Sequence, residues 1–307
     1  MSATIVLVES LRHQYGERVA LDGVSFSVGT GECFGLLGPN GGGKTTLFRI
    51  LTTLLAPTAG RAKISGSDVV RDRAAVRARL GVVFQSPSLD LYLTVRENLL
   101  HGGHLYGLSG QALEDRISQM LTRLGVADRA RDLVRTLSGG LRRRVEIAKC
   151  MLHKPALLIL DEPSTGLDPG ARLDLWGHLQ AIVRDEGATV LITTHFMEEA
   201  ERCDRLAILD HGKLVACGTP GELKSRIGGD CITIEADEPE SLLTRMHDAN
   251  ASMVGRMIRI ETAEAPALAV RLMDNFGPAI RSITIGKPTL EDVFMKETGR
   301  RFEGDGA

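Results

Sequence analysis

A glycine-rich segment at residues 38–45 has the residue types and spacing to bind a phosphate. It reads GPNGGGKT and lies between a short apolar run, residues 33–37, and a segment with helical spacing, residues 44–50. Glycines let backbone N–H groups converge on an anion, and the start of a helix adds more N–H groups and the positive end of its dipole. Lys44 would reach the β- and γ-phosphates, and the hydroxyl of Thr45 would bind Mg²⁺. Strand, loop and helix together predict a binding site for a nucleoside triphosphate.

Two further apolar runs lead to residues that could act on a phosphate. Residues 156–160 are followed by Asp161 and Glu162, and residues 189–193 lead to His195. Because ligands gather at the carboxyl edge of a parallel sheet, we expect these side chains near the phosphate loop. There Asp161 could hold the metal through water, Glu162 could polarise an attacking water and His195 could hydrogen-bond the γ-phosphate, which together describe triphosphate hydrolysis. Charged residues directly after a buried strand can also be simple strand terminators.

Two other side chains are candidates on residue type alone. Tyr15, in a polar segment beside a glycine, could stack on a purine ring, although a partly buried loop tyrosine is at least as common. Gln85, at the end of the apolar run 80–84, could contact the metal or a water, although a surface glutamine is the ordinary alternative.

A second helix start with glycines follows at residues 138–140. Ser138, Gly139 and Gly140 precede the helical spacing of residues 145–152, so backbone N–H groups could bind an anion here as well. A plain helix cap with a flexible turn is the alternative. The three arginines at residues 142–144 are interpreted as a solvated face, as charge runs usually are.

The order of the predicted elements indicates two domains. Alternating apolar strands and helices over residues 1–227 are typical of an α/β fold with a parallel sheet. Residues 87–151 interrupt this pattern with helical spacing only, and Thr94 with Glu97 forms a capping box at the first helix. A pair of glycines precedes residues 230–307, which we predict to be a small α/β domain without a phosphate loop. Its expected strands are residues 231–235, 257–261 and 280–285, alternating with helices at residues 239–248, 265–276 and 290–296.

Composition restricts the class of protein. Of the 307 residues, 43% are hydrophobic and 25% are charged, which is ordinary for a soluble globular protein. The formal net charge of −2 gives no basic character that would favour nucleic acid. No apolar run approaches the roughly 20 residues that span a bilayer, and the first residues lack the pattern of a signal peptide. Five dispersed cysteines without a C-x-x-C pair fit a reducing cytoplasm.

Residues 5–227 resemble the nucleotide-binding subunit of an ABC transporter, with seven motifs in that family's order. Residues 38–45 resemble the Walker A loop. Residues 157–161, followed by Glu162, resemble the Walker B motif with its catalytic carboxylate. Residues 137–141 resemble the signature sequence. The resemblance implies a P-loop ATPase fold with a helical insertion, and ATP and Mg²⁺ as cofactors.

The remaining motifs complete the implied site. Residues 164–168 resemble the D-loop, Tyr15 the aromatic that stacks on adenine, Gln85 the glutamine at the interface with the membrane subunit, and His195 the switch histidine. The implied residues are catalytic Glu162, His195 and Gln85; nucleotide-binding Tyr15, Gly38, Asn40, Gly41, Gly43, Lys44, Thr45, Thr46, Ser138, Gly139, Gly140 and Asp168; and metal-binding Thr45, Gln85 and Asp161.

The resemblance also implies partners. In this family two subunits pack head to tail, and each ATP lies between the Walker A loop of one and the signature of the other. Ser138, Gly139 and Gly140 would therefore contact the γ-phosphate bound by a second ATPase subunit, expected to be another copy of this chain. A separate polytopic membrane permease is the other implied partner, which places the chain peripherally at the cytoplasmic face of the cell membrane. No nucleic acid is expected.

Two features resemble a subgroup, the ATPases of drug- and glycolipid-exporting systems. Leu141 stands where the signature usually ends in glutamine, and an arginine run follows it. Residues 288–294, PTLEDVF, and residues 298–300, TGR, are similar to the tail of the daunorubicin-resistance type. Leucine cannot hydrogen-bond a nucleotide, so we expect a weaker contact across the dimer. The implied function is to power a membrane exporter of a drug, lipid or glycolipid.

Two alternatives stay open at this point. A soluble ABC ATPase acting on ribosomes or DNA is the alternative function, although such proteins usually carry two cassettes or a long insertion. Residues 230–307 could be a docking or dimerisation element, which we favour, or a module that binds a small regulatory ligand.

Overall fold

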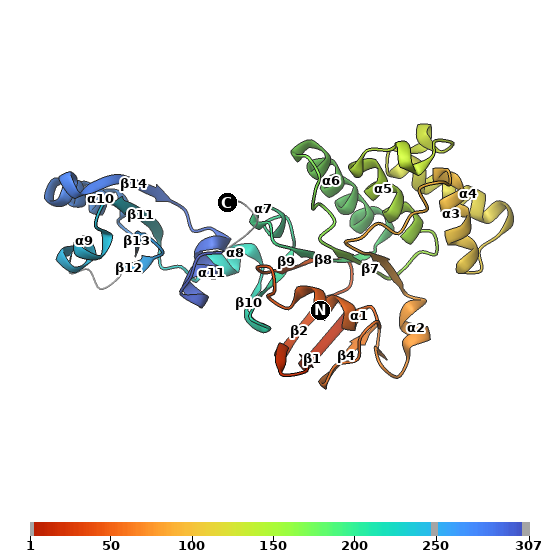
Figure 1. The fold of residues 1–307 in the computed structure, drawn as a ribbon, viewed down its shortest axis with the longest axis horizontal. Coiled ribbons are helices and arrows are strands. Elements are labelled where there is room, and N and C mark those ends of the chain that lie inside the picture. Colours follow the sequence, from red (N-terminus) through yellow and green to blue (C-terminus); the bar gives the residue numbers. More distant parts are fainter. Residues whose placement is uncertain (1–2, 247–250, 303–307) are drawn as a thin grey trace. The chain divides into compact units, whose positions relative to one another are not determined.

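The computed structural model describes residues 3–246 and 251–302. The chain forms two compact units, Met1–Leu214 and Val215–Ala307, and each is described by itself (Figure 1). No helix in these described ranges is long and apolar enough to cross a membrane.

The first unit contains an antiparallel sheet of four strands. Their order is β2 (Arg18–Gly29), β1 (Thr4–Tyr15), β4 (Ala59–Ile64) and β5 (Ser67–Asp68). Buried and exposed residues alternate along much of β1 and β2, because only one face of this sheet packs against the core. Tyr15 is the last residue of β1, so a strand end rather than a free loop positions it.

A six-stranded sheet forms the centre of the first unit. Its order is β10 (Lys213–Gly218), β9 (Arg205–Asp210), β3 (Cys33–Leu37), β8 (Thr189–Thr194), β7 (Leu157–Asp161) and β6 (Leu80–Val83). The strands from β9 to β6 are parallel, as predicted, and the boundary between the two units falls within β10. Every residue of β3, β7 and β8 is buried, which explains the apolar runs at residues 33–37, 157–160 and 190–192. Because these three strands are neighbours, the segments that follow them meet at one edge of the sheet.

Residues 87–151 hold the predicted helical insertion. The group of helices drawn in yellow and light green in Figure 1 is α3, α4 and α5, and the predicted capping box of Thr94 and Glu97 starts α3. The last of them, α5, begins at Gly139, earlier than the predicted residue 145, because Ser138 caps it. The helices of this unit are α1 (Lys44–Leu51), α2 (Arg73–Arg77), α3 (Val95–Leu105), α4 (Gly110–Arg123), α5 (Gly139–Cys150), α6 (Pro169–Glu186) and α7 (Met197–Ala200), with 3₁₀ turns at Ala127–Arg129 and Val134–Thr136.

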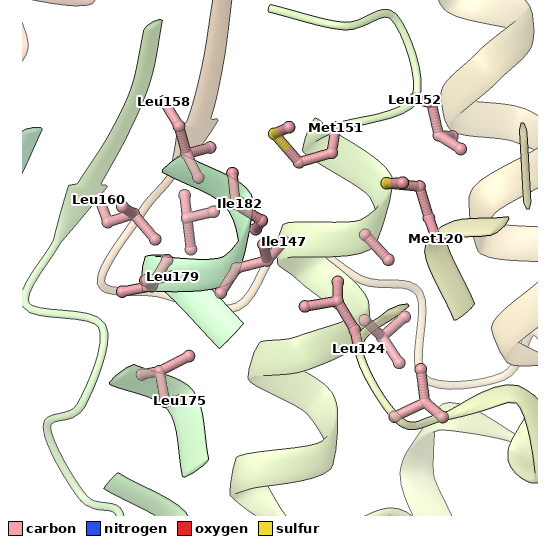
Figure 2. Close-up of a cluster of buried hydrophobic side chains, with 14 of the residues drawn as sticks. Met120, Leu124, Ile147, Met151, Leu152, Leu158, Leu160, Leu175, Leu179 and Ile182 are labelled. Carbon is pink, nitrogen blue, oxygen red and sulfur yellow. The ribbon is translucent and has the colours of Figure 1, made fainter. Parts of the chain in front are cut away.

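A buried apolar cluster joins the helical insertion to the central sheet. Figure 2 shows Leu158 and Leu160 of β7 beside Leu179 and Ile182 of α6 and Ile147 of α5. All of these side chains are buried, and at roughly 25 cal/mol per Å² of apolar area such burial is the main force that holds α5 and α6 on the sheet. The helix that follows the second glycine motif is therefore anchored to the strand that ends in Asp161.

The second unit is an antiparallel sheet with helices. The sheet order is β12-β13-β11-β14, and all of its strand pairs are antiparallel. The sequence did not predict β12, which forms a hairpin with β13 across Gly255. Because of this extra strand, β13 runs antiparallel to β11. The end of the predicted helix 239–248 lies outside the described residues. The elements are α8 (Pro220–Ser225), β11 (Asp230–Ala236), α9 (Pro239–Met246), β12 (Ala251–Val254), β13 (Met257–Thr262), α10 (Ala265–Phe276), a 3₁₀ turn (Gly277–Ala279), β14 (Ile280–Gly286) and α11 (Leu290–Thr298).

The division between the units differs from the predicted boundary at the glycine pair Gly228 and Gly229. Helix α8, which we placed in the first domain, packs against α11 of the second unit. Lys296 of α11 also donates a hydrogen bond to the carbonyl oxygen of Arg226 at 3.2 Å. Whether residues 230–307 form an autonomous domain stays a prediction.

Candidate functional site

The glycine-rich loop has a backbone that only glycine can adopt at its key positions. Gly43 has φ 106°, and a Cβ atom there would lie 2.8 Å from the carbonyl oxygen of Ala20. A Cβ atom on Gly38 would overlap the carbonyl oxygen of Leu209 in β9. Helix α1 starts directly afterwards at Lys44. The predicted sequence of strand, loop and helix is confirmed, and the loop presents helix N–H groups at the sheet edge.

A cleft with a volume of about 250 Å³ opens over this loop. It brings together Tyr15 from β1, the loop itself, the start of α1 and the catalytic candidate Glu162. Arg18 and Arg49, which the sequence did not single out, add two positive charges to the lining. The predicted site residues in the lining are Tyr15, Asn40, Gly41, Gly43, Lys44, Thr45, Thr46 and Glu162.

Lys44 is buried at the floor of this cleft. Its Nζ atom donates to the carbonyl oxygens of Gly38 at 2.7 Å and Pro39 at 3.1 Å. The same atom lies 3.4 Å from Oε1 of Glu162. A buried ammonium group beside a glycine loop suits the polyanionic end of a triphosphate, because the phosphate oxygens can take over these contacts.

Glu162 has a left-handed backbone, with φ 45°. Its N–H group donates to Thr193 of β8, both to the carbonyl oxygen at 3.2 Å and to Oγ1 at 2.9 Å. Such a conformation is unfavourable for a residue with a Cβ atom and is found where the surrounding structure holds it. His195 Nδ1 lies 3.2 Å from Oε2 of Glu162, without hydrogen-bond geometry. The two candidate catalytic side chains therefore face each other at the sheet edge.

Asp161 is buried at the end of β7. The Thr193 hydroxyl donates to its Oδ1 atom at 2.6 Å. Burial raises the pKa of Asp161 above its ordinary value, the hydrogen bond from Thr193 opposes this, and the neighbouring Glu162 charge adds to it. A cation close to Asp161 would relieve the cost of its buried charge.

Tyr15 presents an aromatic ring at the rim of the cleft, where 45% of the residue is exposed. The ring of His13, two residues earlier on the same face of β1, meets it edge to face with centroids 4.6 Å apart. An exposed aromatic face beside a phosphate loop can stack on a purine.

The remaining predicted residues lie outside the lining of this cleft, although the structure describes all of them. Ser138 caps α5 by accepting from the N–H of Leu141 at 3.3 Å, and Asp168 caps α6 by accepting from Ala171 at 2.9 Å. Gly140 is close to the start of α6, since a Cβ atom on it would lie 3.0 Å from Cβ of Ala171. Gln85 is exposed, two residues after β6. Gly139 is exposed at the first turn of α5. Gly38, Asp161 and His195 are buried at or directly after the ends of β3, β7 and β8.

Glu199 is a buried polar residue near the site that the sequence did not single out. Glu199 of α7 accepts hydrogen bonds from Ser164, in the loop after Glu162, and from Thr194 at 2.6 Å. It therefore connects the segment after β7 to the segment after β8. Its charged neighbours in the sequence resemble a solvated helix face, so only the tertiary contacts identify it.

The prediction of a solvated arginine face is wrong for Arg143. Its side chain is buried, whereas Arg142 is half-buried and Arg144 pairs with the exposed Asp174. Its position along the helix could have predicted this burial, because Arg143 lies one turn before the buried Ile147 and so on the same face of α5.

Comparisons with known proteins agree with this geometry. Residues 21–165 match the family described as ABC transporter, and residues 218–298 match the C-terminal domain of ATP-binding proteins similar to DrrA1-3. The daunorubicin resistance ATP-binding protein DrrA3 of Streptomyces coeruleorubidus is 39% identical over 97% of both chains. The Nod factor export ATP-binding protein I of Rhizobium sp. strain N33 is 38% identical over 99% of this chain and 100% of that protein. The structure of cbiO1 from Clostridium perfringens, part of the ABC transporter complex cbiONQ, has a TM-score of 0.68 and 30% identity, covering 72% of this chain and 91% of that chain.

These matches confirm the predicted resemblance and its subgroup, the α/β P-loop fold with a small C-terminal domain, ATP binding and ATPase activity. The chain belongs to the ATP-binding subunits of ABC transporters, in the subgroup of the daunorubicin resistance and Nod factor export ATP-binding proteins.

Proposed function

We propose that this chain hydrolyses ATP with Mg²⁺ and that Glu162 polarises the attacking water. The proposal rests on one observation: buried Lys44 and Glu162 lie next to each other at the phosphate loop. Thr45 and Asp161 supply the hard oxygen donors that Mg²⁺ prefers, and the raised pKa of Asp161 fits a carboxylate that a cation stabilises. Bound Mg²⁺ would neutralise charge on the β- and γ-phosphates. His195 would hydrogen-bond the γ-phosphate.

We further propose that two copies of the chain form each complete site. Ser138, Gly139 and Gly140 lie outside the cleft of their own chain, yet they present a helix N-terminus with two glycines. A partner's triphosphate would be the anion that they bind. Asp168, which caps the neighbouring helix α6, would lie at the same interface, and Gln85 would contact the metal or a water once the dimer closes.

We infer that the dimer powers a separate polytopic membrane permease that exports a drug, lipid or glycolipid. The support is the names of two relatives that match nearly the whole chain, one for daunorubicin resistance and one for Nod factor export. The chain would then bind peripherally at the cytoplasmic face of the cell membrane. Residues 230–307 would act in docking or dimerisation.

The variant Glu162→Gln tests the catalytic role. It should bind ATP as the wild type does, lose about 10²–10⁴-fold in turnover, and accumulate as an ATP-bound dimer in size-exclusion chromatography. Lys44→Ala is the matched comparison, because it should abolish both ATP binding and the dimer. Undiminished hydrolysis by Glu162→Gln would remove Glu162 from the role, and a monomer with bound ATP would contradict the shared site.

A chain without residues 230–307 tests the role of the C-terminal part. The truncated chain should still bind a fluorescent ATP analogue, which shows that its ATPase unit is folded, but its dimer should be weaker. A truncated chain that dimerises normally would count against a dimerisation role for these residues.

A further inference from the structure

Arg143 of α5 is only 7% exposed and binds three separate backbone carbonyl groups. Its Nε atom donates to Pro163 at 2.9 Å, its Nη1 atom to Phe84 at 2.7 Å and its Nη2 atom to Gln85 at 3.4 Å. Pro163 directly follows Glu162, and Phe84 directly follows β6. One guanidinium group therefore joins three segments: α5, the residues after β6 and the residues after β7.

Two other side chains of α5 hold the same segment, residues 84–88. Glu146 accepts from the N–H of Ser88 at 2.6 Å through Oε1 and from Arg143 at 2.8 Å through Oε2. Lys149 donates to the carbonyl oxygen of Ser88 at 2.9 Å. Arg143 and Glu146 are both buried, so neither charge is screened by water and each depends on the other. We call Arg143, Glu146 and Lys149 the α5 clamp.

The chemistry of the clamp requires arginine. A guanidinium group is planar and carries N–H donors in a fixed fork, so it can reach several carbonyl oxygens that point in different directions. A lysine ammonium group at the same place is a compact charge on a flexible stem and could not bind the carbonyls of Pro163 and Phe84 with the same geometry. The hydrogen bonds from Arg143 to residues 84–88 go to backbone carbonyl oxygens. A shift of this segment would therefore act on Arg143 directly.

We propose that Arg143 is a positioning residue that links residues 84–88 to the backbone of Glu162. Displacement of residues 84–88 pulls on Arg143 and, through the carbonyl of Pro163, changes the placement of the Glu162 carboxylate. The same displacement acts on α5, whose first residues are Ser138, as its cap, and Gly139. The proposal rests on the role proposed for Glu162 and adds a route by which contact at residues 84–88 sets the rate of hydrolysis.

Hydrogen exchange on the full chain without nucleotide tests the link independently of catalysis. Arg143→Gln should speed exchange at the N–H groups of Ser88 and Thr165 together, each by about tenfold or more, since both lie in segments that Arg143 holds. Arg144→Gln is the matched control, because it removes a neighbouring arginine that pairs with the exposed Asp174, and it should change neither. Faster exchange at only one of the two sites would overturn the link.

Steady-state kinetics separates positioning from a simple loss of buried charge. Arg143→Gln should lower kcat about tenfold while KM for ATP changes less than about threefold, because the variant leaves Tyr15 and the glycine-rich loop, which would hold the nucleotide, unchanged. The double variant Arg143→Gln with Glu146→Gln removes both charges of this pair, so neither is left buried without its partner. If positioning is correct, kcat of the double variant stays low; recovery to the wild-type kcat would show that Arg143 only balances Glu146. Failure of Glu162→Gln to reduce turnover would instead refute the proposed role of Glu162, while the exchange result would still stand.

Discussion

The left-handed backbone at Glu162 leads to a prediction about stability. We compare Glu162→Gly with Glu162→Ala, which both remove the carboxylate and its approaches to Lys44 and His195. The two variants then differ only in the Cβ atom at φ 45°. A Cβ atom costs roughly 1–2 kcal/mol in this region, and the greater freedom of glycine in the unfolded chain offsets roughly 0.4–1 kcal/mol. We expect the glycine variant to be more stable by about 1 kcal/mol.

Urea denaturation of the nucleotide-free chain would measure this difference. Neither variant should hydrolyse ATP at a wild-type rate, so the glycine variant would be the more stable and equally inactive protein. Gln180, exposed inside α6, is the matched control: there alanine should be more stable than glycine by about 1 kcal/mol, the reverse order. If Glu162→Ala is as stable as Glu162→Gly, the hydrogen bonds that the Glu162 N–H group donates to Thr193 do not hold a strained backbone, and the reasoning is refuted.

Three other predictions follow from single residues. Gly38→Ala should weaken ATP binding and destabilise the chain by about 1–3 kcal/mol, because the new Cβ atom would overlap the carbonyl oxygen of Leu209. Gly177→Ala is the control: it lies in open space within α6 and should stabilise the chain by about 0.5–1 kcal/mol. Thermal melting would measure both stabilities, and nucleotide titration would measure ATP binding. Asp161→Asn should stabilise the chain at pH 7 without Mg²⁺, because burial raises the pKa of Asp161 and its charged form is unfavourable in the fold. A carboxyl group whose pKa is raised in the folded state is protonated there at low pH, where it no longer destabilises the fold. The stability advantage of Asp161→Asn should therefore shrink as pH falls toward about 4. Urea denaturation at several pH values would measure this advantage, and an advantage that grew at low pH would contradict the prediction. Burial raises the pKa of Cys150 to about 12, so iodoacetamide at pH 8 should label it only after unfolding, as peptide mass spectrometry would show.

The parts of the site that follow regular elements could be predicted from the sequence. The apolar run before Asp161 and the glycines before Lys44 each specify a local structure, and parallel strands bring their ends together. The resemblance to a known family added Tyr15 and Ser138, whose residue types alone were ambiguous. The structure places Tyr15 in the cleft and Ser138 outside it.

The rest depended on contacts between residues far apart in the chain. Arg143 lies in a charge run, and only its contacts with Phe84 and Pro163 explain its burial. In the second unit, β12 is a strand of four residues whose partner β13 follows a tight turn, so its short pattern carried little signal. Because β12 was not predicted, the antiparallel pairing of this sheet could not be predicted either. Pairing between distant segments is set by tertiary packing, which local periodicity does not contain.

Purification of the tagged chain from gently solubilised membranes of its native host tests the central claim most directly. We predict that a polytopic membrane protein is recovered with it in stoichiometric amount, and that this protein identifies the permease and the class of substrate. Recovery only from the soluble fraction, together with ribosomes or DNA, would contradict the exporter function.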